Sequence, residues 1–372
     1  MALPALERAA ELWSAPPLVQ LPGQLEPLLA MSGARVEALP MAGRHRALST
    51  ARTLRARSPD VAVLLTPSFS AALLTALGGV PRRRGTATDA RSWLLTDRVD
   101  REPLLRGHRV REFLTLVEGA VGGEAAVRAR PEAELPRPRL RRLSEARRAW
   151  RAVADRPGGD DGRAGGPVVG LVPGGTAVSR RWPASRWREL AGRLLDRGLR
   201  VRVFGGPEEE ELTRRVAAGR PGAAALGGRT GLRALAGGLA SCDAVAANDT
   251  GPMQVAAALE RPLAVVWGAG DPVQTRPLSP RSRLLGTFDL PCHPCLEESC
   301  PRSGRGYRSG TADRECLRLV AVERVERAVL DLLAGDEGGR EGHGAVRERP
   351  REGSGGRRRP AGDLRGERED GG

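Results

Sequence analysis

The second half of the chain repeats one pattern: a short apolar run, a glycine-containing turn and an amphipathic segment. The predicted strands are residues 168–172, 200–204, 243–247 and 263–267, and the first of them is apolar throughout. Helical periodicity marks residues 183–196, where Trp187, Leu190 and Leu194 fall on one face. Strands that alternate with helices through short turns predict an α/β fold with a parallel, doubly wound sheet. Ligands of such sheets bind beyond the carboxyl ends of the strands.

The first half follows the same pattern less clearly. Residues 61–65 are predicted to form a buried strand, and a helix is predicted to follow it and to end at Leu77. We therefore predict two Rossmann-like domains joined by a glycine-rich linker, and a disordered Gly/Arg/Glu tail with too few apolar residues to offset its chain entropy. The predicted segments are 1–155 for the N-terminal domain, 156–166 for the linker, 167–334 for the C-terminal domain and 335–372 for the tail.

Composition narrows the function classes. All 60 basic residues are arginine and the net charge is +15, which could attract nucleic acid, anionic lipid or a phosphorylated substrate. Aromatic residues make up only 3% and do not alternate with basic ones, so we expect no nucleic-acid partner and read the charge first as a solvated surface. No stretch approaches the ~20 apolar residues of a membrane span, and no signal-peptide pattern opens the chain. We expect a cytoplasmic protein.

One predicted turn, residues 248–252 (Asn-Asp-Thr-Gly-Pro), follows a strand and opens a helix. Asp249 or Thr250 could cap that helix, and its free backbone N–H groups could bind phosphate. An ordinary strand-to-helix turn explains the same residues. The motif alone therefore does not establish a site.

Two more turns carry compatible chemistry. In residues 173–181, two glycines permit close approach of a ligand, Thr176 offers a hydroxyl, and Arg180 or Arg181 could neutralise a phosphate. After the next strand, Glu209 could accept hydrogen bonds from a ribose. Each turn alone has an ordinary structural explanation. Three of them at strand carboxyl ends in one domain predict a single cleft for a nucleotide diphosphate.

The order of these motifs resembles glycosyltransferase family 9, the bacterial ADP-heptose:lipopolysaccharide heptosyltransferases. The similar segments in the second half are residues 180–183, 205–207, 248–253, 268–272 and 292–295, and those in the first half are 65–72, 79–85 and 94–99. The resemblance implies a GT-B fold, in which two Rossmann-like domains face each other with the donor in the C-terminal one and the acceptor on the N-terminal one.

The resemblance also implies a function. We expect inverting transfer of a heptose, or a related sugar, from an ADP-sugar donor to a lipopolysaccharide-core or other cell-surface glycan acceptor, with neither metal nor cofactor. The partners would be the ADP-sugar and a glycan or glycolipid acceptor at the inner face of the membrane, where the protein could associate peripherally. We expect a monomer.

By position, the resemblance implies a set of donor-binding residues: Thr176, Arg180, Glu209, Asp249, Thr250, Gly251 and Gln254. Arg180 stands where the family has a lysine at the donor phosphates, which keeps the charge and changes its shape. Glu209 lies near the acidic residue expected on the ribose. Gln254 replaces the histidine of many members and leaves room for another nucleotide sugar.

The beginning of the chain departs from the family. Members begin with an apolar strand and a Gly-Asp loop that carries the presumed general base, and a helix follows; here residues 1–6 already resemble that helix. We therefore predict that the catalytic base lies upstream of Met1, and that the chain from Met1 binds donor but transfers sugar poorly. A non-catalytic nucleotide-sugar-binding relative is the alternative. A dinucleotide oxidoreductase is disfavoured because no Gly-x-Gly-x-x-Gly turn follows a predicted strand.

Four cysteines near the end of the second half raise the question of a metal. Cys292, Cys295, Cys300 and Cys316, with His293 among them, could bind zinc. Their spacing is irregular, so a loop of reduced thiols is the favoured alternative, and we expect no metal. Cys242 is predicted to lie in the core.

Overall fold

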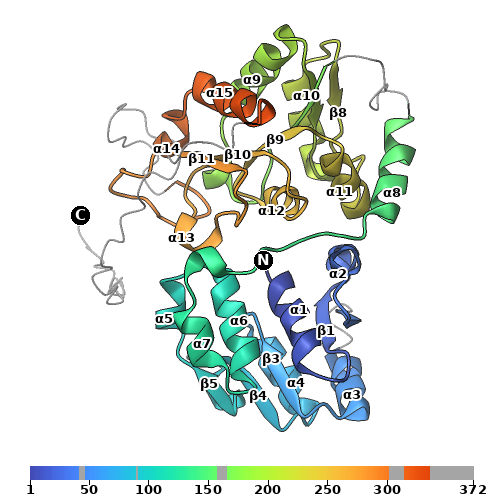
Figure 1. Ribbon diagram of the computed structural model, residues 1–372, viewed down its shortest axis with the longest axis vertical. Helices are drawn as coiled ribbons and strands as arrows, with labels where there is room; N and C mark the ends of the chain where they lie inside the picture. Colours follow the sequence, from blue (N-terminus) through green and yellow to red (C-terminus); the bar gives the residue numbers. More distant parts are fainter. Residues whose placement is uncertain (42–46, 89–90, 157–165, 301–313, 336–372) are drawn as a thin grey trace, which may run out of the picture.

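A computed structural model describes residues 1–41, 47–88, 91–156, 166–300 and 314–335. The predicted linker and tail lie mostly or wholly outside these ranges. The described chain forms two lobes, with the N-terminal half below and the C-terminal half above in Figure 1. Of the helices in the described residues, none has both the length and the hydrophobicity needed to cross a bilayer.

The C-terminal lobe is built on one parallel sheet of six strands in the order β11-β10-β9-β6-β7-β8. The strands are β6 (Val168–Val172), β7 (Arg200–Val203), β8 (Ala223–Ala225), β9 (Ala244–Asn248), β10 (Leu263–Trp267) and β11 (Ser282–Gly286). Every residue of β6, β9 and β10 is buried, as expected where helices cover both faces of a parallel sheet. The doubly wound sheet predicted for this half is confirmed.

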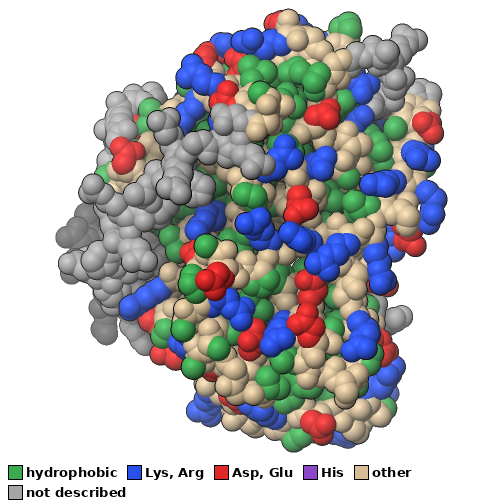
Figure 2. Space-filling model, in the orientation of Figure 1, with side chains coloured by type: hydrophobic (Ala, Val, Ile, Leu, Met, Phe, Trp, Pro, Cys, Tyr) green, Lys and Arg blue, Asp and Glu red, His purple; other side chains and the backbone are tan. Residues whose placement is uncertain are grey.

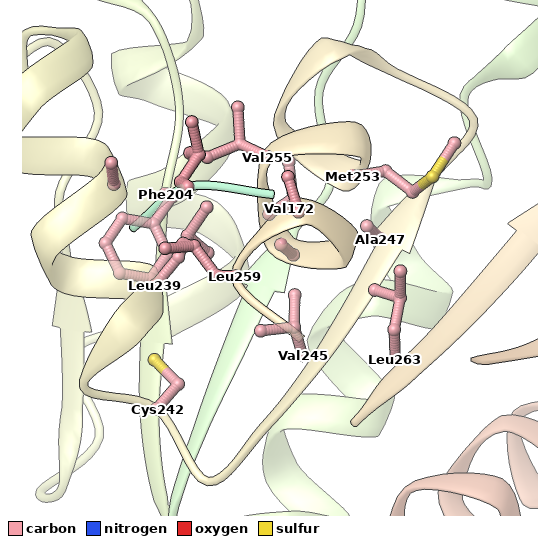
Figure 3. Close-up of a cluster of buried hydrophobic side chains, with 14 of the residues drawn as sticks. Val172, Phe204, Leu239, Cys242, Val245, Ala247, Met253, Val255, Leu259 and Leu263 are labelled. Atoms are coloured by element: carbon pink, nitrogen blue, oxygen red, sulfur yellow. The ribbon is translucent and has the colours of Figure 1, made fainter. Parts of the chain in front are cut away.

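Helices cover both faces of this sheet. The helices of this lobe are α8 (Ser144–Ala154), α9 (Ala184–Asp196), α10 (Glu210–Ala217), α11 (Leu232–Ala240), α12 (Gly251–Ala258), α13 (Pro272–Thr275), α14 (Glu315–Arg318) and α15 (Val322–Leu333). Val169 and Leu171 of β6 pack under α9 and α15, whereas Val172 packs on the other face with α11 and α12. Figure 3 shows this second cluster, where Cys242 is buried as predicted.

The N-terminal lobe contains two separate parallel sheets rather than one. The first pairs β1 (Leu18–Pro22) with β2 (Glu37–Met41), and the second has the order β3-β4-β5, with β3 (Val61–Leu64), β4 (Arg82–Thr86) and β5 (Asp97–Val99). Only Leu64 of β3 is buried, so the prediction of a buried strand here is wrong for its first three residues. Their burial is incomplete because no strand of the described residues pairs with the free edge of β3.

The helices of the N-terminal lobe are α1 (Leu3–Leu12), α2 (Glu26–Ser32), α3 (Ala47–Arg57), α4 (Phe69–Leu77), α5 (Glu102–Leu105), α6 (Arg109–Gly119) and α7 (Glu124–Ala129). Pro4 in the first turn of α1 fits a helix start. Ala5 and Ala9 of α1 pack against Val110 and Leu114 of α6, so α1 forms part of a buried apolar cluster of this lobe.

The chain crosses between the lobes through residues 135–143, and α8 follows directly. Trp150 of α8 shares a cluster with Phe204 and Leu239 of the C-terminal lobe. The approach of α8 to α11 is so close that a Cβ on Gly237 would lie 2.1 Å from the carbonyl oxygen of Ala146. We therefore propose that the C-terminal domain begins with α8, before the boundary at 155 that the linker composition suggests.

Candidate active site

The loops after β6, β7 and β9 meet at the carboxyl edge of the C-terminal sheet. Asn248, at the end of β9, is fully buried and joins two of them. Its Nδ2 donates to the carbonyls of Pro173 at 2.7 Å and Gly174 at 3.1 Å, and its Oδ1 accepts from the backbone N–H of Trp182 at 3.2 Å. Asn248 thus brings two of the three predicted turns together.

Glu209 joins the third loop to the first. Its Oε1 accepts from the backbone N–H of Gly175 at 2.7 Å, and its Oε2 accepts from that of Gly206 at 2.8 Å. Each carboxylate oxygen keeps a further lone pair for a ligand. The residue predicted to contact ribose therefore also holds two loops in register.

Glycines are needed where these loops approach each other. A Cβ on Gly174 would lie 1.9 Å from Oε1 of Glu209. Gly175 has φ +141°, a conformation that other residues rarely adopt, and its Cβ would lie 2.7 Å from Cγ2 of Thr250. The floor of the site is therefore made of backbone, which leaves amide groups close to any ligand above it.

A buried ion pair lies beside this floor. Nη1 of Arg180 is 3.2 Å from Oδ2 of Asp249, whose side chain is only 5% exposed, whereas that of Arg180 is 33% exposed. Burial raises the pKa of the Asp249 carboxyl, and the Arg180 charge counteracts that rise. Asp249 holds the guanidinium of Arg180 on one side, and the side that is open to solvent could bind an anionic ligand.

The two neighbouring arginines have different partners. Nε of Arg181 donates to the carbonyl of Gly175 at 2.6 Å, so Arg181 braces the first loop. Thr176 is exposed beside it. Of the two arginines that the sequence offered as phosphate ligands, Arg180 is therefore the one beside the buried carboxylate.

The turn after β9 opens α12. Thr250 is the N-cap by position, yet neither its side chain nor that of Asp249 makes a capping hydrogen bond within the described residues, so the predicted side-chain cap is wrong. The hydroxyl of Thr250 donates instead to the carbonyl of Asn248 at 3.3 Å. A Cβ on Gly251 would meet open space. The first amides of α12 thus have no side-chain cap, as an anion site at a helix N-terminus requires.

Gln254 connects the turn to the junction between the lobes. Its Nε2 donates to the carbonyl of Thr275 at 2.7 Å. The next residue, Arg276, forms an ion pair with Glu132 of the N-terminal lobe, and its carbonyl lies 2.8 Å from Nε2 of His108. Burial lowers the pKa of His108 to about 4. The site therefore lies next to the contact between the lobes, where Figure 1 shows α13.

The loop that contains Cys292, Cys295 and Cys300 contacts the site loops through backbone hydrogen bonds. The backbone N–H of Leu296 donates to the carbonyl of Ala269, and that of Ser179 donates to the carbonyl of Glu298, each at 3.0 Å. Burial, together with the neighbouring cysteines, raises the pKa of Cys316 to about 12. No group of three or more His, Cys, Asp or Glu side chains in the described part of the chain is arranged to hold a metal ion.

Sequence reasoning missed Asn248 as a functional position, because nothing in a strand-to-helix turn shows where its amide points. One signal was available: Asn248 is the only asparagine in the chain and is the first residue of the predicted phosphate turn. The loop-joining role of Glu209 was likewise not foreseen.

Comparisons with known proteins agree with this geometry. Residues 47–304 match the family description "Glycosyltransferase family 9 (heptosyltransferase)". The chain is 31% identical over 288 residues to lipopolysaccharide heptosyltransferase 2 of Escherichia coli, covering 72% of this chain and 78% of that protein. It is 39% identical over 160 residues to lipopolysaccharide heptosyltransferase 1 of Pseudomonas aeruginosa, covering 43% of each.

Solved structures give the same answer. The fold is similar to that of Escherichia coli ADP-heptose lipopolysaccharide heptosyltransferase II, with a TM-score of 0.72 and 26% identity over 91% of this chain and 96% of that one. A family 9 glycosyltransferase from Veillonella parvula shares the fold, with a TM-score of 0.69 and 18% identity over 90% and 93% of the two chains. The GT-B prediction is confirmed, and the binding-only alternative is not favoured. The chain belongs to glycosyltransferase family 9 and is a glycosyltransferase.

Proposed function

We propose that this protein transfers a heptose from ADP-heptose to a lipopolysaccharide-core acceptor with inversion at the sugar. The observation that carries the proposal is the convergence of three strand-end loops on the uncapped start of α12, beside the Asp249–Arg180 pair. The names of the relatives support the choice of donor and acceptor, since two of them are lipopolysaccharide heptosyltransferases.

We assign the donor as follows. The diphosphate lies at the first amides of α12, next to Gly251 and Thr250, and Arg180 neutralises it from the side. Glu209 accepts hydrogen bonds from the ribose through the lone pairs that its backbone contacts leave free, and Thr176 lies in the same loop cluster. Asp249 holds Arg180, and Gln254 faces the junction, where the transferred sugar meets the acceptor.

The acceptor reaches the donor from the N-terminal lobe. Attack by its hydroxyl needs a base to take the proton. Figure 2 shows basic side chains gathered along the line where the lobes meet, and the net charge is +15. These charges support a glycolipid acceptor presented at the anionic inner face of a membrane.

A transfer assay tests the proposal. The full chain is incubated with ADP-heptose and a heptose-free core acceptor, and both ADP release and the mass of the product are measured. We expect the product mass to rise by one heptose, with UDP- and GDP-sugars giving none. ADP binding is measured separately by calorimetry. Absence of ADP binding would overturn the donor assignment, whereas ADP binding without transfer would overturn the proposed reaction.

A further inference from the structure

Two aromatic side chains stand exposed on the N-terminal lobe and touch each other. Trp93 is 66% exposed and Phe69 is 43% exposed, and their ring centroids are 6.4 Å apart at an interplanar angle of 54°. They are the exposed aromatic side chains of the described residues, in a chain with only 3% aromatic composition. Two large exposed rings in contact form an apolar surface of the kind that marks binding sites.

Hydrogen bonds connect the loops that carry these rings. Phe69 begins α4 after β3, and Trp93 lies in the short 3₁₀ turn Ser92–Leu94 after β4. Arg91 is fully buried between the loops, where its Nη1 donates to the carbonyl of Thr66 at 2.6 Å and its Nη2 donates to that of Thr86 at 2.7 Å. A buried guanidinium that joins both loops presents the two rings as one surface.

This surface lies at the edge of the lobe that faces the donor site. The strands β3, β4 and β5 are parallel, so their carboxyl ends share one edge. Leu65, directly after β3, packs in the same cluster as Leu278 of the C-terminal lobe. The residues after β5 lead to His108, which contacts Arg276 just beyond the Gln254–Thr275 hydrogen bond.

Two serines flank Phe69 in the chain. Ser70 is exposed, and its Oγ lies 2.8 Å from Oγ of Ser68. An apolar face bordered by hydroxyls matches a sugar ring, whose C–H groups pack on aromatic faces and whose hydroxyls exchange hydrogen bonds.

We propose that Phe69 and Trp93 form a stacking platform for a sugar ring of the acceptor. The proposal rests on the proposed glycosyltransferase reaction and names a surface that selects its second substrate. The platform binds and orients the acceptor, and takes no part in proton or sugar transfer. A membrane surface that accepts the same rings is the competing occupant, and the experiment separates the two.

The test measures acceptor binding to the full chain saturated with ADP, using a core oligosaccharide freed of its acyl chains. We expect Trp93→Ala and Phe69→Ala each to weaken binding about three- to tenfold, Trp93→Phe to keep most of the affinity, and ADP binding to stay unchanged in all of them. Leu77→Ala is the matched control, because Leu77 is 47% exposed at the other end of the same helix. Melting curves confirm that the variants are folded.

A second measurement uses Trp93 itself as the probe. Its fluorescence should be protected from acrylamide quenching when the oligosaccharide binds, and this protection should disappear in Trp93→Phe. Equal affinities for wild type and both alanine variants would overturn the platform alone. Alanine variants that lose only their binding to anionic vesicles would replace it with a membrane contact. A wild type that binds ADP and no acceptor would overturn the proposed reaction, and the platform with it.

Discussion

The two lobes have the same strand-helix repeat and are held together by different forces. In the C-terminal lobe, β6, β9 and β10 are buried along their whole length, between two apolar clusters. In the N-terminal lobe, the strands β1 and β3 belong to two separate sheets and are mostly half-buried. The C-terminal lobe therefore buries its central strands completely, whereas the N-terminal lobe leaves β1 and β3 partly exposed.

Charged residues replace part of the missing apolar packing in the N-terminal lobe. Its middle strand β4 begins with three arginines. Arg84 is buried and forms an ion pair with Asp97 at 2.6 Å, while Arg82 reaches the other oxygen of the same carboxylate, also at 2.6 Å. Removing one partner of a buried ion pair is strongly destabilising because it leaves the other charge buried without compensation. The lobes should therefore respond differently to the loss of one side chain.

The largest effect is expected from Asp97→Ala, which leaves the buried Arg84 without one of its carboxylates. We expect a loss of about 3–5 kcal/mol in the free energy of unfolding, measured by urea denaturation. Asp196→Ala is the control, since that carboxylate is 66% exposed in its ion pair with Arg220 and should cost about 0–1 kcal/mol. Similar losses for the two variants would mean that the N-terminal lobe does not depend on its charges.

A pair of matched leucines tests the apolar side of the comparison. Leu171 of β6 is fully buried, whereas Leu21 of β1 is half-buried. We expect Leu171→Ala to cost about 2–5 kcal/mol and Leu21→Ala about 1 kcal/mol. Denaturant melts of both variants measure the difference. If the costs were equal, the edge of β1 would be as well packed as the centre of the larger sheet.

The same contrast explains what could be predicted from the sequence. In the C-terminal lobe, β6 and β10 are continuous apolar runs and have the predicted ends, because a strand buried on both faces has little polar content. β4 was missed because Arg-Arg-Arg-Gly-Thr does not look like a strand, and its burial depends on a carboxylate 13 residues away from Arg84. Local periodicity cannot show such a partner.

The candidate site divides in a similar way. Its loops were predictable, because glycines and a helix-opening turn after strands are local signals. The side-chain contacts were not, since the amide of Asn248 reaches a loop 75 residues away and the carboxylate of Glu209 one 34 residues away. Residue type placed these groups at the strand ends, and only the tertiary fold determines which backbone groups they bind.

His108 lies at the contact between the lobes and should make it pH-dependent. Burial lowers its pKa to about 4, from an ordinary 6.5. Between these values the unfolded chain binds a proton that the folded chain does not, so stability is complete above pH 6.5 and falls as the pH drops toward 4. The loss is at most about 3 kcal/mol.

The check on His108 is the pH dependence of unfolding for wild type and His108→Gln. The wild type should lose stability more steeply below pH 6.5, and the variant should lack that part of the slope. Burial also lowers the pKa of His293, so the difference between the two curves isolates His108. Parallel curves would show that His108 is solvated in solution and that the contact between the lobes is open.

The smallest of these effects concerns the loops rather than either core. Arg180 lies beside the uncapped start of α12, and its other side is open to solvent. Arg180→Ala should weaken ADP binding by about 1.5–3 kcal/mol, the usual contribution of a hydrogen bond to a charged group, without lowering stability to the same extent.

Removal of its partner cation leaves Asp249 buried with a pKa already raised by desolvation. The variant should therefore be measured at two pH values, because protonation of Asp249 at lower pH would restore part of the ADP affinity by removing a negative charge beside the phosphates. Arg188→Ala, on the exposed face of α9, controls for the loss of one positive charge from the same lobe. Equal weakening by both substitutions would assign the effect to net charge and would remove Arg180 from the site.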